Sequence, residues 1–300
     1  MSDAIIQGIL LGGYYAMLAS GLSLIFGVAR FINLAHGDLA LLSAYLVLTL
    51  VRQFDINPFA ALVVVLPVMA ALGWLLQQWL FARTMRGGIL LPLLTTFGLS
   101  AAIQNGIYGA FGSDAASLGN YIGSLSWDSF DVPFGISIGK LPVLTFVTAV
   151  VALGALQFVL SRTRFGRALR ATSQDSEAAR LSGVDSERVQ RGAAAIAVAL
   201  AGLAGAFLAM RALINPYSGP AELIYAFEAV VIGGIGSLWG TLLGGIVLGV
   251  AQCVGAAVSP QGFQLAGHLV FLAWLGVRFY RSGAAGPSSL RARILKWRSA

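Results

Sequence analysis

RTRFGRALRATSQDSEAARLSGVDSERVQR, residues 162–191, is the only long charged stretch between hydrophobic runs in this chain of 300 residues. It holds seven arginines and four acidic residues. The runs on both sides are close to the roughly 20 apolar residues that a helix needs to cross a bilayer. Arginine and lysine beside a span mark its cytoplasmic side. We therefore expect a cytoplasmic loop that presents a surface to a soluble partner, and membrane helices in the rest of the chain.

The composition also indicates a membrane protein. Hydrophobic residues make up 58% of the chain and charged residues 10%, with a mean hydropathy of +0.83, whereas soluble domains carry about 25% charged residues. The apolar runs are continuous rather than alternating, which excludes an outer-membrane barrel. The predicted fold class is all-α, a polytopic transmembrane helical bundle with about eight membrane segments.

One of these segments is predicted to be a broken or re-entrant helical hairpin. Residues 224–258 are too many for one plain span, and glycines interrupt them at 233, 234, 236 and 240. Non-helical backbone at membrane depth needs protein or a wet cavity around it. The plain spans are expected at residues 4–28, 39–51, 59–81, 89–111, 141–160, 193–213 and 263–280.

Charge predicts which loops share a side of the membrane. The 162–191 loop and the basic tail 282–300 are expected in the cytoplasm, because both are rich in arginine. Residues 112–140 hold three aspartates and one lysine and are expected as an outer loop. Residues 1–281 then form one transmembrane domain. The tail mixes basic, aliphatic and aromatic residues, which suits contact with anionic membrane lipid, although a disordered orientation signal is an equal alternative.

Local signals inside the charged loop predict two short helices, 165–172 and 176–182. Ser173 or Asp175 can cap the start of the second helix. Gly183 stands where a glycine commonly ends a helix.

The second short helix carries small apolar residues among charges. Ala178 and Leu181 are three apart and share a face, with the small Ala179 beside them. Such a helix could press into a groove of a partner. The alternative is a solvated loop whose arginines only set orientation, and the spacing alone does not separate the two.

Polar residues inside spans are costly, about 2.5–3.5 kcal/mol for a charge at mid-membrane, and so they usually face a partner or a cavity. His36 and Asp38 could brace a pore, or could cap their helix and neutralise Arg30; we favour the second for Asp38. Glu228 could face a translocation path or lie at a helix N-terminus.

The amides and the remaining charged groups of the spans have simpler interpretations. Gln104 and Asn105 are expected to bond a neighbouring helix rather than substrate. His268 is expected to be a packing residue, and Arg211 is expected to snorkel at the outer end of its span.

Several functions are not supported by the sequence. Cys253 is the single cysteine, so an internal disulfide and a cysteine metal site are excluded, and no metal site is expected. No Gly-x-x-x-x-Gly-Lys-Ser/Thr occurs, so we expect no ATP bound through a P-loop. A nucleic-acid role is not expected, because no basic patch with interleaved aromatics occurs outside the tail. The chain contains no His-Glu-x-x-His motif, so the sequence gives no support for an intramembrane enzyme.

Four stretches of the chain form a recognisable set. They are GLSLIFGVARFINLAHG at 21–37, TFGLS at 96–100 followed by Gln104 and Asn105, EAA at 177–179 with Gly183, and VIGGIGS at 231–237 with Gly240. In these stretches, in family order and over most of its length, the chain resembles the branched-chain amino acid permeases of ABC importers (the LivH-type subunit), and the EAA piece resembles the coupling motif of ABC importer permeases. Trp239 stands where the family often has proline.

The resemblance implies an inner-membrane permease that pairs with a related second permease, two cytoplasmic ATPases and a periplasmic binding protein. ATP would be bound and hydrolysed by the ATPases, so this chain would have no catalytic residue and no cofactor of its own. The expected ATPase-coupling residues are Arg170, Glu177, Ala178, Ala179, Leu181 and Gly183. The pore or gating candidates are Asn33, His36, Gly37, Gln104, Asn105, Glu228, Gly233, Gly234 and Gly236.

Two other functions remain open at this level. Closely similar permeases carry amides or urea, so the substrate is not fixed by the chain. An ion-coupled secondary amino-acid transporter would need charged sites within the membrane, for which Asp38, Glu228 and His268 are scattered candidates.

Overall fold

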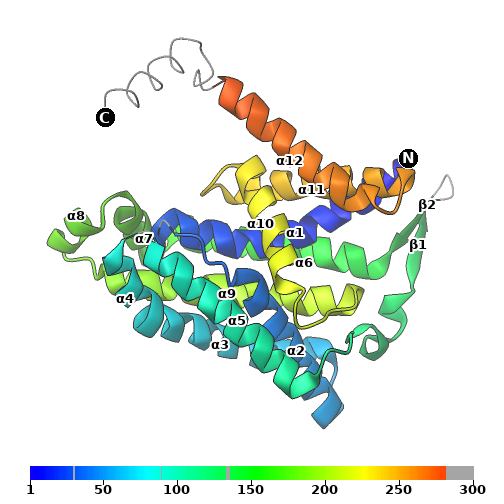
Figure 1. Cartoon of the computed structure of the whole chain (residues 1–300), viewed down its shortest axis with the longest axis horizontal. Helices are drawn as coiled ribbons and strands as arrows, with labels where there is room; N and C mark the ends of the chain where they lie inside the picture. The colour runs from blue at the N-terminus through cyan, green and yellow to red at the C-terminus, as the bar shows by residue number, and fades with distance from the viewer. Residues whose placement is uncertain (30, 89, 133–135, 282–300) are drawn as a thin grey trace, which may run out of the picture.

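The computed structural model describes residues 1–29, 31–88, 90–132 and 136–281 (Figure 1). The basic tail 282–300 and Arg30 lie outside the described residues. The elements in chain order are α1 (Ser2–Ala29), α2 (His36–Phe54), α3 (Pro58–Leu76), the π-helix η1 (Gln77–Phe81), α4 (Ala82–Thr84), η2 (Met85–Gly87), α5 (Leu90–Phe111), η3 (Gly119–Tyr121), η4 (Gly123–Ser126), β1 (Ser129–Val132), β2 (Ile136–Gly139), α6 (Lys140–Arg162), α7 (Arg164–Gln174), α8 (Ser176–Leu181), α9 (Ser186–Arg211), α10 (Gly219–Gly233), α11 (Leu238–Val258) and α12 (Gly262–Arg281).

Eight helical segments within the described residues are long and apolar enough to cross a membrane, which confirms the predicted multi-pass helical bundle. They are α1, α2, the continuous segment Pro58–Thr84, α5, α6, α9, α11 and α12. The interrupted stretch is a 15-residue helix, α10, followed by the full-length span α11.

The main difference from the predicted boundaries is the start of α9. Hydropathy places that span at 193–213, whereas α9 begins at Ser186. The reason is a cap: the Asp185 carboxylate accepts a hydrogen bond from the Arg188 backbone N–H at 2.9 Å. The cap lets the helix extend for two polar turns beyond its apolar part.

The centre of the bundle is built from α1, α2 and α9, whereas α12 lies at its edge. In the most apolar stretch of each helix, α1 and α9 bury 83% and 78% of their residues, and α12 buries 6%. Glycines allow α1 and α11 to pack backbone against backbone. A Cβ added to Gly12 would lie 2.4 Å from the Ile246 Cα, and one added to Gly249 would lie 2.3 Å from the Gly8 carbonyl oxygen.

The bundle has two distinct ends, which Figure 1 shows at its left and right. The short helices α7 and α8 form one end. The N-terminus and the β1–β2 hairpin form the other, where the Gln7 amide donates to the Ser137 carbonyl at 3.4 Å. Residues 112–140 and 162–191 therefore lie at opposite ends, as their charges predict.

The described residues of the predicted outer loop 112–140 contain local structure. It contains the 3₁₀ turns η3 and η4 and an antiparallel strand pair in which Phe130 faces Ile138. An isolated bridge between Ala116 and Ile214 ties it to the segment after α9. The loop is thus fixed to the ends of α6 and α9.

Candidate functional site

The charged loop folds into two capped helices, as predicted. The Thr163 hydroxyl accepts from the Gly166 N–H at 3.1 Å and starts α7. The Asp175 carboxylate accepts from the N–H groups of Glu177 and Ala178, at 2.9 and 3.0 Å, and starts α8. Of the two predicted caps for this helix, the structure uses the aspartate.

The end of α8 depends on Gly183. Its φ is +82°, in the left-handed region that favours glycine. The Val184 N–H donates to the Ala179 carbonyl and the Gly183 N–H to the Arg180 carbonyl, both at 3.0 Å. These two bonds form a Schellman motif, which satisfies carbonyls that the helix end leaves free.

The residues of α8 divide between an inner and an outer face. Ala179 is buried with 5% exposure, whereas Leu181 is 88% exposed. Ala178 and Glu177 are also exposed. The expectation that Ala179 joins the presented surface is therefore wrong, because this residue packs toward the bundle. Leu181 and Ala178 form the apolar part of the outer face.

Arg170 lies on α7, away from that outer face. Its guanidinium donates to the Leu160 carbonyl at the end of α6. Arg170 also lines a cavity of about 320 Å³. Gly236, from the turn between α10 and α11, lines the same cavity. The charged loop thus adjoins the break in the α10–α11 hairpin.

The predicted glycines 233, 234 and 236 build that break. Gly234 and Gly236 have φ values of +89° and +83°. A Cβ on Gly233 would lie 2.1 Å from the Gly240 carbonyl oxygen, so α10 and α11 meet closely at the turn. The Gly236 N–H donates to the Ser23 hydroxyl of α1 at 3.2 Å. The turn is therefore fixed against the central helix.

A second cluster joins α2 to α5. The carboxylate of Asp38, which is fully buried, accepts from the Ser100 hydroxyl at 2.6 Å and from the Gln104 amide at 2.9 Å. Gln104 therefore bonds a neighbouring helix, as expected. Asp38 lies in the first turn of α2, whose N-cap residue Ala35 makes no side-chain cap bond. The predicted neutralisation of Arg30 falls outside the described residues. Asn105 is not part of this cluster: it is exposed and donates to the Ala101 carbonyl of its own helix.

The predicted residues Asn33, His36 and Gly37 fix the connection between α1 and α2 inside the bundle. The His36 Nε2 lies 2.9 Å from the Leu18 carbonyl oxygen, halfway along α1. A Cβ on Gly37 would lie 2.0 Å from the Gly219 carbonyl oxygen. Asn33 and His36 are fully buried, and each keeps one nitrogen without a partner in the part of the chain that the structure describes. These residues brace helices against one another.

Glu228 and His268 form a pair between α10 and α12. Their Oε1 and Nδ1 atoms are 2.6 Å apart, and Glu228 is 2% exposed. The His268 ring stacks on Tyr225, with centroids 6.2 Å apart. The two residues are 40 positions apart, and no local pattern in the sequence joins them. The interpretation of Glu228 as a helix N-terminal carboxylate is wrong, because it lies inside α10.

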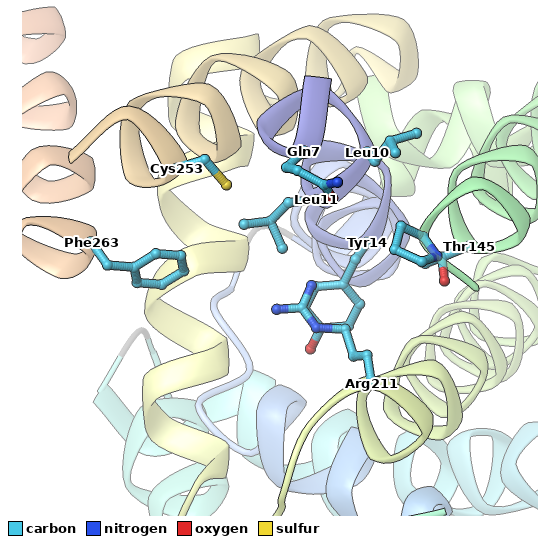
Figure 2. Close-up of a pocket in the computed structure, with 9 residues that line it drawn as sticks. Gln7, Leu10, Leu11, Tyr14, Thr145, Arg211, Cys253 and Phe263 are labelled. Carbon is cyan, nitrogen blue, oxygen red and sulfur yellow. The ribbon is translucent and has the colours of Figure 1, made fainter. Parts of the chain in front are cut away.

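Sequence reasoning missed a cluster around Tyr14. The Arg211 guanidinium lies 5.0 Å from the centroid of the Tyr14 ring, and the Tyr14 hydroxyl donates to the Glu222 carboxylate at 2.7 Å. Arg211 and Tyr14 both line a cavity, where Figure 2 shows them together. Instead of snorkelling away, Arg211 folds over the ring. The only signal in the sequence was an arginine at a span end.

Comparisons with known proteins identify the family of this chain. The family described as "Branched-chain amino acid transport system / permease component" matches residues 4–275. The permease protein BraD of Pseudomonas aeruginosa, named for a high-affinity branched-chain amino acid transport system, is 32% identical, covering 87% of this chain and 88% of that protein.

Two Escherichia coli K12 proteins with names of the same kind also match. LivH is 28% identical over 86% of this chain and 87% of its own length, and LivM is 26% identical over 86% of this chain and 65% of its own length. No solved structure matches the chain. Because the family match covers nearly the whole bundle, this chain is a multi-pass membrane protein that belongs to the family of branched-chain amino acid transport permeases.

Proposed function

We propose that this chain is a permease subunit of an ABC importer that moves branched-chain amino acids across the bacterial inner membrane. The names of the relatives support the substrate class. The observation that carries the coupling role is α8: a helix of six residues, capped at both ends, that holds Leu181 outward with 88% exposure. An apolar side chain held outward on a short capped helix can enter a hydrophobic groove of a protein partner.

The partners in this proposal are a second permease, two ATPases and a binding protein. The match to both LivH and LivM supports a related permease as the second membrane subunit. The ATPases would dock on α7 and α8 in the cytoplasm, and the binding protein at the β1–β2 end. ATP would be hydrolysed on the ATPases, and this chain would bind no cofactor.

The contacts suggest a route for the motion. Force on Leu181 would reach α9 through the Ser186 hydroxyl, which donates to the Ser176 carbonyl at 3.1 Å. It would reach α6 through Arg170. The cavity beside Arg170 leaves room for α7 to move toward Gly236. Displacement of that turn would shift α10, which carries Glu228.

The direct test is reconstitution of the chain with its partners in vesicles. We expect leucine uptake that requires ATP and all the membrane and ATPase subunits. ATP-dependent uptake of an amide or urea in place of leucine would change the substrate class. Uptake by this chain alone, driven by a proton gradient, would replace the proposal with a secondary transporter that uses the Glu228–His268 pair.

A further inference from the structure

The cavity around Arg211 lies at the β1–β2 end of the bundle. Four of its lining residues stand close to helix ends that meet there: Gln7 in α1, Pro142 in α6, Arg211 in α9 and Phe263 in α12. Tyr14 lies 12 residues after the start of α1, which is about 18 Å along a helix. The cavity therefore reaches from the helix ends into the bundle.

The walls of this cavity are mostly apolar. Leu10 and Leu11 line it from α1, and Phe263 from α12. Figure 2 shows these side chains around the same space as Tyr14 and Arg211. Its volume of about 320 Å³ is at the lower end of the roughly 300–1,000 Å³ that small-molecule sites occupy. The size suits one small molecule rather than a long acyl chain.

Arg211 supplies the single positive charge of this lining. The charge of Arg211 interacts with Glu222, the carboxylate that bonds Tyr14. Among the described residues, however, no carboxylate forms an ion pair with its guanidinium. The Tyr14 ring holds the guanidinium from one side, and Tyr14 is itself held by its bond to Glu222. A guanidinium positioned in this way can bind a carboxylate through two parallel hydrogen bonds.

We propose that this cavity binds the carboxylate of an aliphatic amino acid on Arg211, with the side chain against Leu10, Leu11 and Phe263. The ligand class rests on the proposed function, because an aliphatic carboxylate is the chemistry of the proposed substrate. The site would be a docking point at the outer mouth of the permease, occupied before the substrate reaches the glycine turn.

Cys253 provides a reporter that needs no engineering. It is the single cysteine of the chain and lines this cavity. In the assembled complex, alkylation of Cys253 by a small maleimide should slow when leucine is present. At about nine times the Kd the rate should fall about tenfold, since it follows the fraction of empty sites. Cys253→Ser gives the background labelling of the partner subunits.

Ligand analogues and two variants separate the possible occupants. 4-Methylpentanoate, which keeps the carboxylate, should protect Cys253, and leucinamide, which lacks it, should not. Arg211→Gln should raise the leucine concentration needed for protection about 10- to 100-fold. Arg211→Lys should retain part of the protection by leucine. Arg278→Gln, at the other end of α12, should behave as the wild type.

The outcomes distinguish this proposal from the transport function. ATP-driven leucine uptake with no protection of Cys253 would overturn the site and leave the permease function intact. Protection by anionic lipid in the vesicles, and not by leucine, would identify a lipid-headgroup site and also overturn the proposal. Equal protection by leucine and leucinamide would show that Arg211 does not bind the carboxylate of the ligand, and would overturn the proposal.

Discussion

The interface between α1 and α11 and the short helix α8 are built by opposite means. In the first, glycines bring two backbones into contact, and a single added Cβ would overlap main-chain atoms. In the second, a six-residue helix is held by caps at its ends and leaves Leu181, its one large apolar side chain, outside. Added volume in the first region should disrupt the fold, whereas an exposed side chain of the second, such as Leu181, can change with little harm to it. Residues that hold the fold and residues that we propose to contact a partner are thus separated in space.

The largest effect is expected from Gly12→Val. The new Cβ would lie 2.4 Å from the Ile246 Cα, and main chain cannot move aside as a side chain can. Overpacking usually lowers the free energy of unfolding by about 1–3 kcal/mol, and we expect Gly12→Val to lower it by more than this. The yield of folded protein on size exclusion should collapse. Gly98→Val is the matched control, because a Cβ at Gly98 meets nothing within 4 Å. Similar yields for both variants would refute the role of close packing.

Leu181→Asp should have a large effect on transport and almost none on stability. The side chain is exposed, and substitutions at exposed positions usually change the free energy of unfolding by no more than about 0.5 kcal/mol. If Leu181 fills a groove on the ATPase, the aspartate would place an unpaired charge there, and ATP-dependent uptake should fall at least about tenfold. Leu213→Asp makes the same change at a leucine that is 71% exposed and far from α8, and should keep uptake. A wild-type rate for Leu181→Asp would exclude this residue from the docking surface.

Gly183→Ala should have an intermediate effect. Its Cβ has open space, but φ of +82° places an alanine in the left-handed region, at a cost of about 1 kcal/mol. We expect fraying of the end of α8 and a partial loss of uptake. Gly112→Ala is the matched control, because Gly112 directly follows α5, has φ of +75° and has equally open space. The two variants should melt alike and differ in uptake; equal uptake would show that the C-cap of α8 is not needed for coupling.

The smallest effect is expected at the outer loop. The hydrogen bond from Lys140, at 2.9 Å, lowers the pKa of the exposed Asp128 carboxyl below its usual value. A lowered pKa adds stability above the unfolded pKa of about 3.9, and this stability is lost as pH falls through the folded pKa. Asp128→Asn should melt slightly below the wild type at neutral pH, and the two should converge in acid. A constant difference at all pH values would mean that the charge is irrelevant.

Local signals in the sequence predicted the parts of the molecule that depend on neighbouring residues. Apolar runs placed the spans, and Asp175 and Gly183 placed both ends of α8, because a cap and its helix are adjacent in the chain. The partners of Asp38 were not predictable, since Ser100 and Gln104 lie 62 and 66 residues away on another helix. The direction in which Ala179 points depends on how α8 rests on the bundle. Arg211 was misread for the same reason: its partner, Tyr14, is at the other end of the chain.

The short length of α10 has a consequence for biogenesis. Fifteen residues extend about 22 Å, less than the roughly 30 Å of the hydrocarbon layer, and the helix carries Glu222 and Glu228. We expect such a segment not to partition into lipid by itself as it leaves the ribosome. It would enter together with α11, after α1 and α2 are in place to receive it. A nascent chain stopped at Gly236 should therefore leave Glu222 accessible to water, and extension past Val258 should protect it.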